Sequence, residues 1–271
     1  MTGFPLAEFL VLYGFSLFGA IAILPYSFHL AGDRLSQAKL PGPVLALISF
    51  LQTAFLMAVA VGVGLVAAQP VGLGAPIVQA ALAGESVLVS IVKLLPVSFG
   101  LGLLAFVIMA LLERYVFAPY VPEALRTSDV KAKAWMRLLA SFYGGIDEEI
   151  LMRLFIVSGL AWILGRFWQD AGGRPAGGVY WTAIFVAALL FGLGHLPATQ
   201  ALTPLSPMLV LRAVALNGVA GIAFGWLYWR YGLEAAMLSH FSADLLLHVV
   251  GPLFTSRVYG STINTQTSPH S

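Results

Sequence analysis

The chain has 271 residues, of which 59% are hydrophobic and only 10% are charged. Soluble domains carry about 25% charged residues, so this composition excludes a soluble globular protein and predicts an integral membrane protein. The net charge of +2 comes without a basic run that would indicate a nucleic-acid partner. Cysteine is absent, which excludes disulfides, thiolate metal sites and a cysteine nucleophile.

Apolar segments of the length that a bilayer requires, about 20 residues, follow one another along the chain. No sustained alternation of apolar and polar residues accompanies them, which favours helices over a barrel. We therefore predict an all-α, polytopic transmembrane helical bundle of about seven or eight spans. The expected spans cover residues 7–31, 44–68, 88–112, 147–166, 178–196, 207–229 and 233–254.

The first segment has no positively charged region before it, so we expect it to be a retained helix and not a cleaved signal peptide. Residues 128–142 are mildly amphipathic, with Lys131, Lys133 and Arg137 near one side, which predicts an interfacial helix leading into the fourth span. The pair Gly144-Gly145 then offers a hinge or a point of close packing before an acidic cluster.

The pattern predicts three regions: N-terminal transmembrane helices over 1–127, a helical core over 128–256 and a polar tail over 257–271. Lysine and arginine are concentrated in the loop over 113–146, which places that loop in the cytoplasm and the N-terminus outside. The Ala- and Gly-rich composition is typical of a bacterial chain, so the expected location is the bacterial cytoplasmic membrane.

Ionisable residues interrupt three of the apolar segments. A charged side chain near the bilayer centre costs about 2.5–3.5 kcal/mol on insertion scales, so such a set requires a reason, and a buried catalytic site is the leading one. The residues are Glu148, Glu149 and Arg153 in the fourth span, His195 at the end of the fifth, and His240 with Asp244 in the last.

Helical spacing divides the acidic cluster. Glu149 and Arg153 are four residues apart, so they share a helix face and predict an internal ion pair. Glu148 is rotated about 100° from Glu149, which leaves its carboxylate free for chemistry.

Antiparallel threading predicts that His195 lies near the beginning of the fourth span, at a depth similar to that of Glu148. His240 and Asp244 share one face of the last span, and His248 extends that stripe towards the bundle interior. A water between Glu148 and His195 could then attack a carbonyl carbon. His240 would donate a hydrogen bond to the oxyanion, while Asp244 would orient His240 or, if protonated, donate as well. This chemistry needs no metal, cofactor or covalent intermediate.

The same residues form three spaced motifs: EEILMR fits EExxxR, FGLGH fits FxxxH, and HFSAD fits HxxxN/D. In that order, over roughly residues 130–250, the chain resembles the CPBP family of intramembrane glutamic endopeptidases, which includes the type II CAAX prenyl endopeptidases and the bacteriocin-processing Abi proteins. The resemblance implies that Glu148 and His195 activate water and that His240 and the fourth motif position form the oxyanion site. That position is typically Asn in the prenyl endopeptidases, whereas here it is Asp244. The implied substrate is a membrane-associated peptide or protein, cleaved towards the cytoplasmic side.

Other interpretations stay open at this point. Glu149, Arg153 and His248 are expected to support the site, while His195 could cap helix carbonyls and His240 with Asp244 could be a tertiary pair. A metal-dependent membrane hydrolase is a second alternative, although no HExxH motif is present. Its possible ligands are Glu148, His195, His240, Asp244 and His248. A non-catalytic scaffold or immunity protein of the same fold is a further alternative, whereas the absence of an internal repeat argues against a transporter.

Overall fold

The computed structural model describes residues 3–32, 38–126 and 132–251. Within these ranges every regular element is helical, apart from one isolated bridge between Gln169 and Pro175. The predicted all-α class is therefore confirmed. The predicted tail over 257–271 lies outside the described residues, as does the boundary predicted at 127/128.

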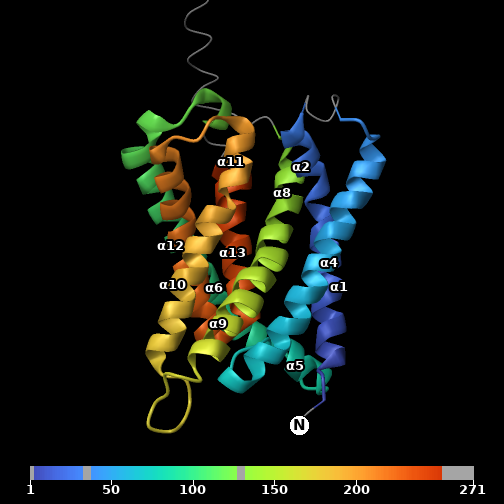
Figure 1. The fold of residues 1–271 in the computed structure, drawn as a ribbon, viewed down its shortest axis with the longest axis vertical. Helices are drawn as coiled ribbons and strands as arrows, with labels where there is room; N and C mark the ends of the chain where they lie inside the picture. Colours follow the sequence, from blue (N-terminus) through green and yellow to red (C-terminus); the bar gives the residue numbers. More distant parts are fainter. Residues whose placement is uncertain (1–2, 33–37, 127–131, 252–271) are drawn as a thin grey trace, which may run out of the picture.

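Six helices in the described ranges are long and apolar enough to cross a membrane. They stand side by side as an elongated bundle (Figure 1). They are α1–α2 (Leu6–Ala22 and Leu24–Ala31), α4–η1 (Gly42–Ala68 and Gln69–Val71), α6–η2–η3 (Leu88–Leu112, Glu113–Phe117 and Ala118–Tyr120), α10–α11 (Gly177–Gly194 and Leu196–Leu202), α12 (Pro207–Tyr231) and α13–η6 (Leu233–Asp244 and Leu245–Val250).

The expected fourth span differs from the prediction. Its residues form the second half of one helical run that also passes from end to end of the bundle (Figure 1). The run comprises α8 (Ala134–Tyr143), η4 (Gly144–Glu148), η5 (Ile150–Val157) and α9 (Ser158–Leu164). Asp147, Glu148, Glu149 and Arg153 make it too polar to count as an apolar span. A span count of seven or eight is thus not confirmed: the described residues contain six apolar helices and one more polar run.

The expected interfacial helix is the first part of this run. Helix α8 packs against α1 and against η6 at the end of the last span, and its Arg137 is buried, donating to the backbone oxygen of Ala132 at 2.8 Å. One side of α8 is therefore packed into the bundle, while Trp135 and Leu138 stay exposed, and its place at a membrane surface remains a prediction.

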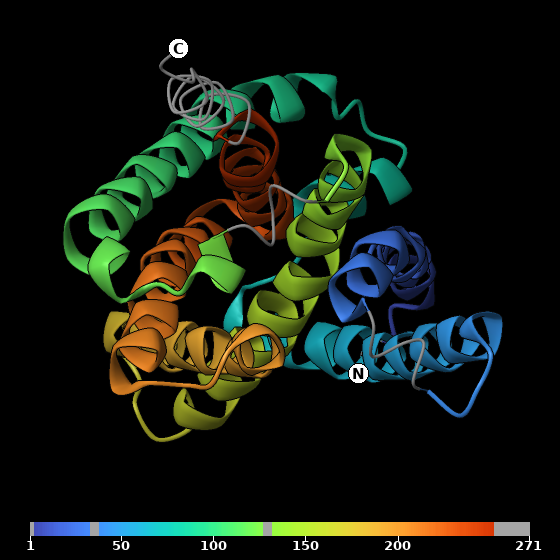
Figure 2. The same cartoon turned by 90° about the horizontal axis from the view of Figure 1, so that it is seen from above.

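Helix α13 occupies the interior of the bundle, between α6, α12 and the α8–α9 run (Figure 2). Small residues permit this packing: Ala235, Ala236 and Ala243 are at most 1% exposed. A Cβ on Gly102 of α6 would lie 2.6 Å from the backbone oxygen of Ser239. Small residues at helix contacts are the usual means of bringing membrane helices close together. Large apolar side chains such as Phe55, 74% exposed, instead face outward.

A short helix, α5 (Pro76–Leu82), is fixed at the end of the bundle that holds the chain's N-terminus (Figure 1). The amide of Val78 donates to Glu234 Oε1 at 2.9 Å, and Gln79 donates to Glu8 Oε1 at 3.0 Å. The buried carboxylate of Glu8 and the partly buried one of Glu234 thus join α5 to the beginnings of α1 and α13.

Candidate active site

The predicted pair between Glu149 and Arg153 is present at the centre of the bundle. Arg153 Nη1 lies 3.1 Å from Glu149 Oε1, and the two residues are 1% and 0% exposed. A second nitrogen, Nη2, donates to the backbone oxygen of Gly221 on α12 at 3.2 Å. The Arg153 guanidinium also lies between the rings of Phe191 and Phe224, 5.4 and 5.5 Å from their centroids. The arginine is therefore held in place by three helices.

Glu149 has a second partner that sequence spacing does not indicate. Nδ1 of His240 donates a hydrogen bond to the same Glu149 oxygen, Oε1, at 2.7 Å. The imidazole also stacks on Phe224, with centroids 4.8 Å apart and planes at 24°. Glu149 thus connects Arg153 to His240 and holds the histidine ring in its orientation. The sequence interpretation had expected Glu149 only to pair with Arg153 and Asp244 to orient His240.

The other nitrogen of His240 faces two more carboxylates. Nε2 lies 3.7 Å from Glu148 Oε2 and 3.6 Å from Asp244 Oδ1. Both separations exceed the usual range of a hydrogen bond, so Nε2 has neighbours of opposite charge without being bonded to either. The Glu148 and Asp244 side chains are 24% and 17% exposed, whereas that of Glu149 is fully buried. The two partly accessible carboxylates and Nε2 therefore form the open side of the cluster.

Glycine allows these groups to meet. A Cβ added to Gly144 would overlap Asp244 Oδ2 and would lie 3.2 Å from His240 Nε2. At Gly145 it would lie 3.0 Å from the Cβ of Phe241. Of the two predicted roles for this glycine pair, close packing is the one that the structure shows. The wider, π-helical turns of η4 and η5 carry the acidic cluster past this contact, and such turns occur frequently at functional sites.

His195 lies at the junction of α10 and α11, where Pro197 follows in the first turn of the new helix. Its Nδ1 donates to the backbone oxygen of Phe191 at 2.8 Å. That bond assigns the proton of a neutral ring to Nδ1 and leaves Nε2 as an acceptor.

Phe191 brings the two motif histidines together. Its ring meets His195 edge-on at 4.7 Å and His240 at 5.8 Å between centroids. Asp244 lies within electrostatic range of Glu148, His195 and His248. All seven residues that the sequence singled out are thus gathered around one region, with His248 at its edge in η6.

One buried acid was missed by the sequence interpretation. Asp147 is 0% exposed, and neither carboxylate oxygen has a hydrogen-bond partner among the described residues. It lies against α1, where a Cβ added to Gly19 would overlap its Oδ2. Gly19 lies 128 positions before Asp147 in the chain, so no local sequence pattern indicates this contact.

The described residues include no group of three or more His, Asp or Glu side chains arranged to hold a metal ion.

One comparison with known proteins finds a related family. Residues 129–246 match the model of a family described as type II CAAX prenyl endopeptidase Rce1-like. The matched segment contains Glu148, His195, His240 and Asp244 and thus the whole cluster except His248. No curated protein and no solved structure matches the chain.

Proposed function

We propose that this chain, which belongs to the type II CAAX prenyl endopeptidase Rce1-like family through residues 129–246, is an intramembrane endopeptidase of the glutamic type. Family membership supports a membrane endopeptidase in general. The glutamic mechanism is our inference from one observation: Glu148 and Asp244 approach the same nitrogen of His240, at 3.7 and 3.6 Å, while its other nitrogen is held by Glu149.

Glu148 is the proposed general base. Its side chain is the most exposed of the three carboxylates around His240, at 24%, and no arginine or lysine pairs with it among the described residues. A water bound between Glu148 and the acceptor nitrogen of His195 would lose a proton to the carboxylate as its oxygen attacks the peptide carbonyl carbon. General-base catalysis of this kind contributes about 10²- to 10⁴-fold in rate.

His240 is the proposed oxyanion donor. As an imidazolium it donates from both nitrogens, so Nδ1 keeps its bond to Glu149 while Nε2–H faces the developing oxyanion. Donors held in place before the reaction lose no reorganisation energy during it. Glu149 already orients the His240 ring, so Asp244 is not needed for that role. We assign Asp244 its other predicted role, in which the protonated carboxyl group donates a hydrogen bond to the same oxyanion.

The proposed reaction then goes to completion without a metal and without a covalent intermediate. The tetrahedral intermediate collapses, the peptide C–N bond breaks, and the proton held by Glu148 passes to the leaving amine. The products are a new amine and a new carboxylic acid, which keeps the second proton of the water until it ionises in the aqueous phase, and Glu148 returns to its ionised state. In this scheme Glu149, Arg153 and His248 support the site without touching substrate.

The proposed substrate is a peptide segment of a membrane-associated protein in a bacterial cytoplasmic membrane. His195 lies at the beginning of α11, near the end of the bundle at which the α6 span finishes (Figure 1). Arg126, Lys131 and Lys133 follow that span in the chain, and the positive-inside rule favours the cytoplasm for this end. The family name makes a prenylated C-terminal CAAX segment one substrate to test, and an unmodified membrane peptide is the other.

Comparative membrane proteomics tests the proposal. Cells carrying the wild-type chain are compared with cells carrying Glu148→Gln, Asp147→Asn or no chain. We expect the same uncleaved membrane proteins to accumulate in the Glu148→Gln and deletion cells, and not in the Asp147→Asn cells, because Asp147 faces α1. Equal processing by wild type and Glu148→Gln would refute the glutamic mechanism and favour a non-catalytic role.

A further inference from the structure

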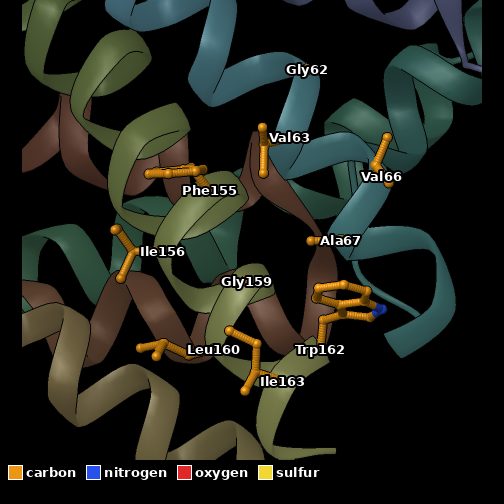
Figure 3. A pocket seen from close by; sticks show the side chains of 10 residues that line it. All are labelled: Gly62, Val63, Val66, Ala67, Phe155, Ile156, Gly159, Leu160, Trp162 and Ile163. Carbon is orange, nitrogen blue, oxygen red and sulfur yellow. The ribbon is translucent and has the colours of Figure 1, made fainter. Parts of the chain in front are cut away.

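An apolar groove lies on the outer face of the bundle, away from the catalytic cluster. It has a volume of about 480 Å³ and runs between α4 and the η5–α9 part of the central run (Figure 3). Val63 and Val66 line one wall, and Phe155, Ile156 and Ile163 line the other. Its volume falls within the range of about 300–1,000 Å³ that small-molecule sites occupy.

Two glycines make the groove deep. A Cβ added to Gly159 would meet no atom within 4 Å, and one added to Gly62 would meet only the ring of Phe9, at 3.7 Å. The space is therefore left by missing side chains and is not a by-product of poor packing. Val63, Val66 and Ile163 are 49%, 53% and 50% exposed, so the groove opens away from the bundle, towards the hydrocarbon that surrounds a transmembrane protein.

One end of the groove carries a cation. Trp162 lines the groove, and the guanidinium of Arg166 lies over its ring, 4.1 Å from the centroid. Arg166 follows the end of α9 at Leu164, where the chain leaves the bundle (Figure 1). Among the described residues no carboxylate forms an ion pair with it. Tryptophan and arginine side chains in this position are typical of the boundary between hydrocarbon and headgroups.

We propose that the groove holds one acyl chain of a glycerophospholipid and that Arg166 pairs with its phosphate. An apolar hollow that ends at a stacked, unpaired guanidinium matches a ligand with an apolar chain and an anionic head. The planar guanidinium binds phosphate through two parallel hydrogen bonds, and stacking on Trp162 fixes its orientation beforehand.

This inference goes beyond the proposed protease activity and does not depend on it. Phe155 and Ile156 line the groove, whereas their neighbours Leu154 and Arg153 face inward and are 0% and 1% exposed. A bound chain would therefore support the outer face of the helical segment whose inner face holds the Glu149–Arg153 pair.

Native mass spectrometry of the full chain in detergent tests the site. The probes are palmitoyl-oleoyl phosphatidylglycerol and the diacylglycerol with the same two chains. We expect Gly159→Leu and Gly62→Val, which fill the groove, to lower retention of both probes. Arg166→Gln is expected to lower retention of phosphatidylglycerol about tenfold and to leave diacylglycerol unchanged, because a charge-assisted bond to phosphate is lost.

Matched variants separate this site from the general lipid belt. Gly100→Leu fills another exposed glycine with open space around its Cβ, and Arg174→Gln removes an exposed arginine of the same loop that pairs with Asp170. Both should retain lipid as the wild type does. The proposal would be overturned if the control variants lost as much lipid as the groove variants, or if both groove-filling variants retained lipid like the wild type. It would also be overturned if the protein were a dimer without bound lipid that dissociates when the groove is filled.

Discussion

At the scale of single residues, the site assigns different work to adjacent acids. Glu149 is fully buried and bonded to Arg153 and His240, whereas Glu148 is partly accessible and has only the approach of His240 Nε2 at 3.7 Å. Asp147 lies on a third face of the same helix. Three consecutive carboxylates thus have three different surroundings, because each successive residue turns by about 100° around a helix.

Replacing Glu149 by Gln should destabilise the protein and also remove activity. The change leaves the Arg153 charge buried without its partner, and breaking a buried pair costs about 3–5 kcal/mol. Thermal unfolding in detergent, together with a cleavage assay, measures both effects. Unchanged thermal stability would show that the pair does not contribute to folding.

Replacing Asp244 by Asn tests its proposed donor role. An amide donates a hydrogen bond in the same place without needing a proton, so the variant should keep activity within about tenfold of wild type. The ratio of variant to wild-type rate should rise with pH, since only the carboxyl group must hold a proton to donate. A ratio that is independent of pH would assign Asp244 a purely structural task.

At the scale of helices, glycines determine how near the reactive groups come. Gly144 lies against His240 and Asp244, so the central run can approach α13 only where no side chain intervenes. Gly144→Ala should therefore displace Asp244 and lower the cleavage rate about 10²-fold, the size of loss that a misplacement of about 1 Å produces. Gly218→Ala, at a helical glycine whose Cβ would have open space, is the control. Comparable rates for the two variants would contradict this geometry.

Gly19 and Asp147 provide a second contact between helices. Gly19→Ala should destabilise the chain by about 1–3 kcal/mol, because the new methyl group overlaps the Asp147 carboxylate and overpacking has about this effect. Asp147→Ala removes the obstacle, so the double variant should recover most of the loss. A double-mutant cycle on unfolding midpoints measures this coupling, and additive losses would count against the contact.

The helices and the cluster of polar residues around His240 could be predicted from the sequence, because helix length and helix face follow from local spacing. The i, i+4 pair Glu149–Arg153 was predictable from the helix repeat, and apolar segment length predicted the helices. The bond from His240 to Glu149 joins residues 91 positions apart, so no local pattern encodes it. The contact of Gly19 with Asp147 escaped prediction for the same reason.

At the scale of the whole molecule, six apolar helices pack together with one polar helical run. The run was predicted as an ordinary span because it is long enough to cross a bilayer and its other residues are mostly apolar. Its inner face is enclosed by α1, α4, α10 and α13, which lets it carry five charged residues that a lipid-facing position would not tolerate. The helices before residue 127 form the other side of this enclosure: α4 packs on η5 and α6 packs on α13.

This enclosure predicts that the chain folds as a unit. A truncation that begins at residue 128 retains the whole family-matched segment but exposes the buried faces of α13 and η5 that α6 and α4 cover. It should fail to accumulate as a folded protein, as measured by size-exclusion chromatography in mild detergent. Co-expression of residues 1–127 as a separate chain should restore a complex. A stable, active truncation would show that the N-terminal helices are dispensable.

The central claim is that Glu148 activates the attacking water. The most direct measurement is kcat/KM of the purified full chain on a substrate identified by proteomics, compared between wild type, Glu148→Gln and Asp147→Asn. We predict a loss of about 10²- to 10⁴-fold for Glu148→Gln, with unfolding temperature unchanged, and a rate near wild type for Asp147→Asn. A Glu148→Gln protein that is folded and cleaves at the wild-type rate would contradict the account.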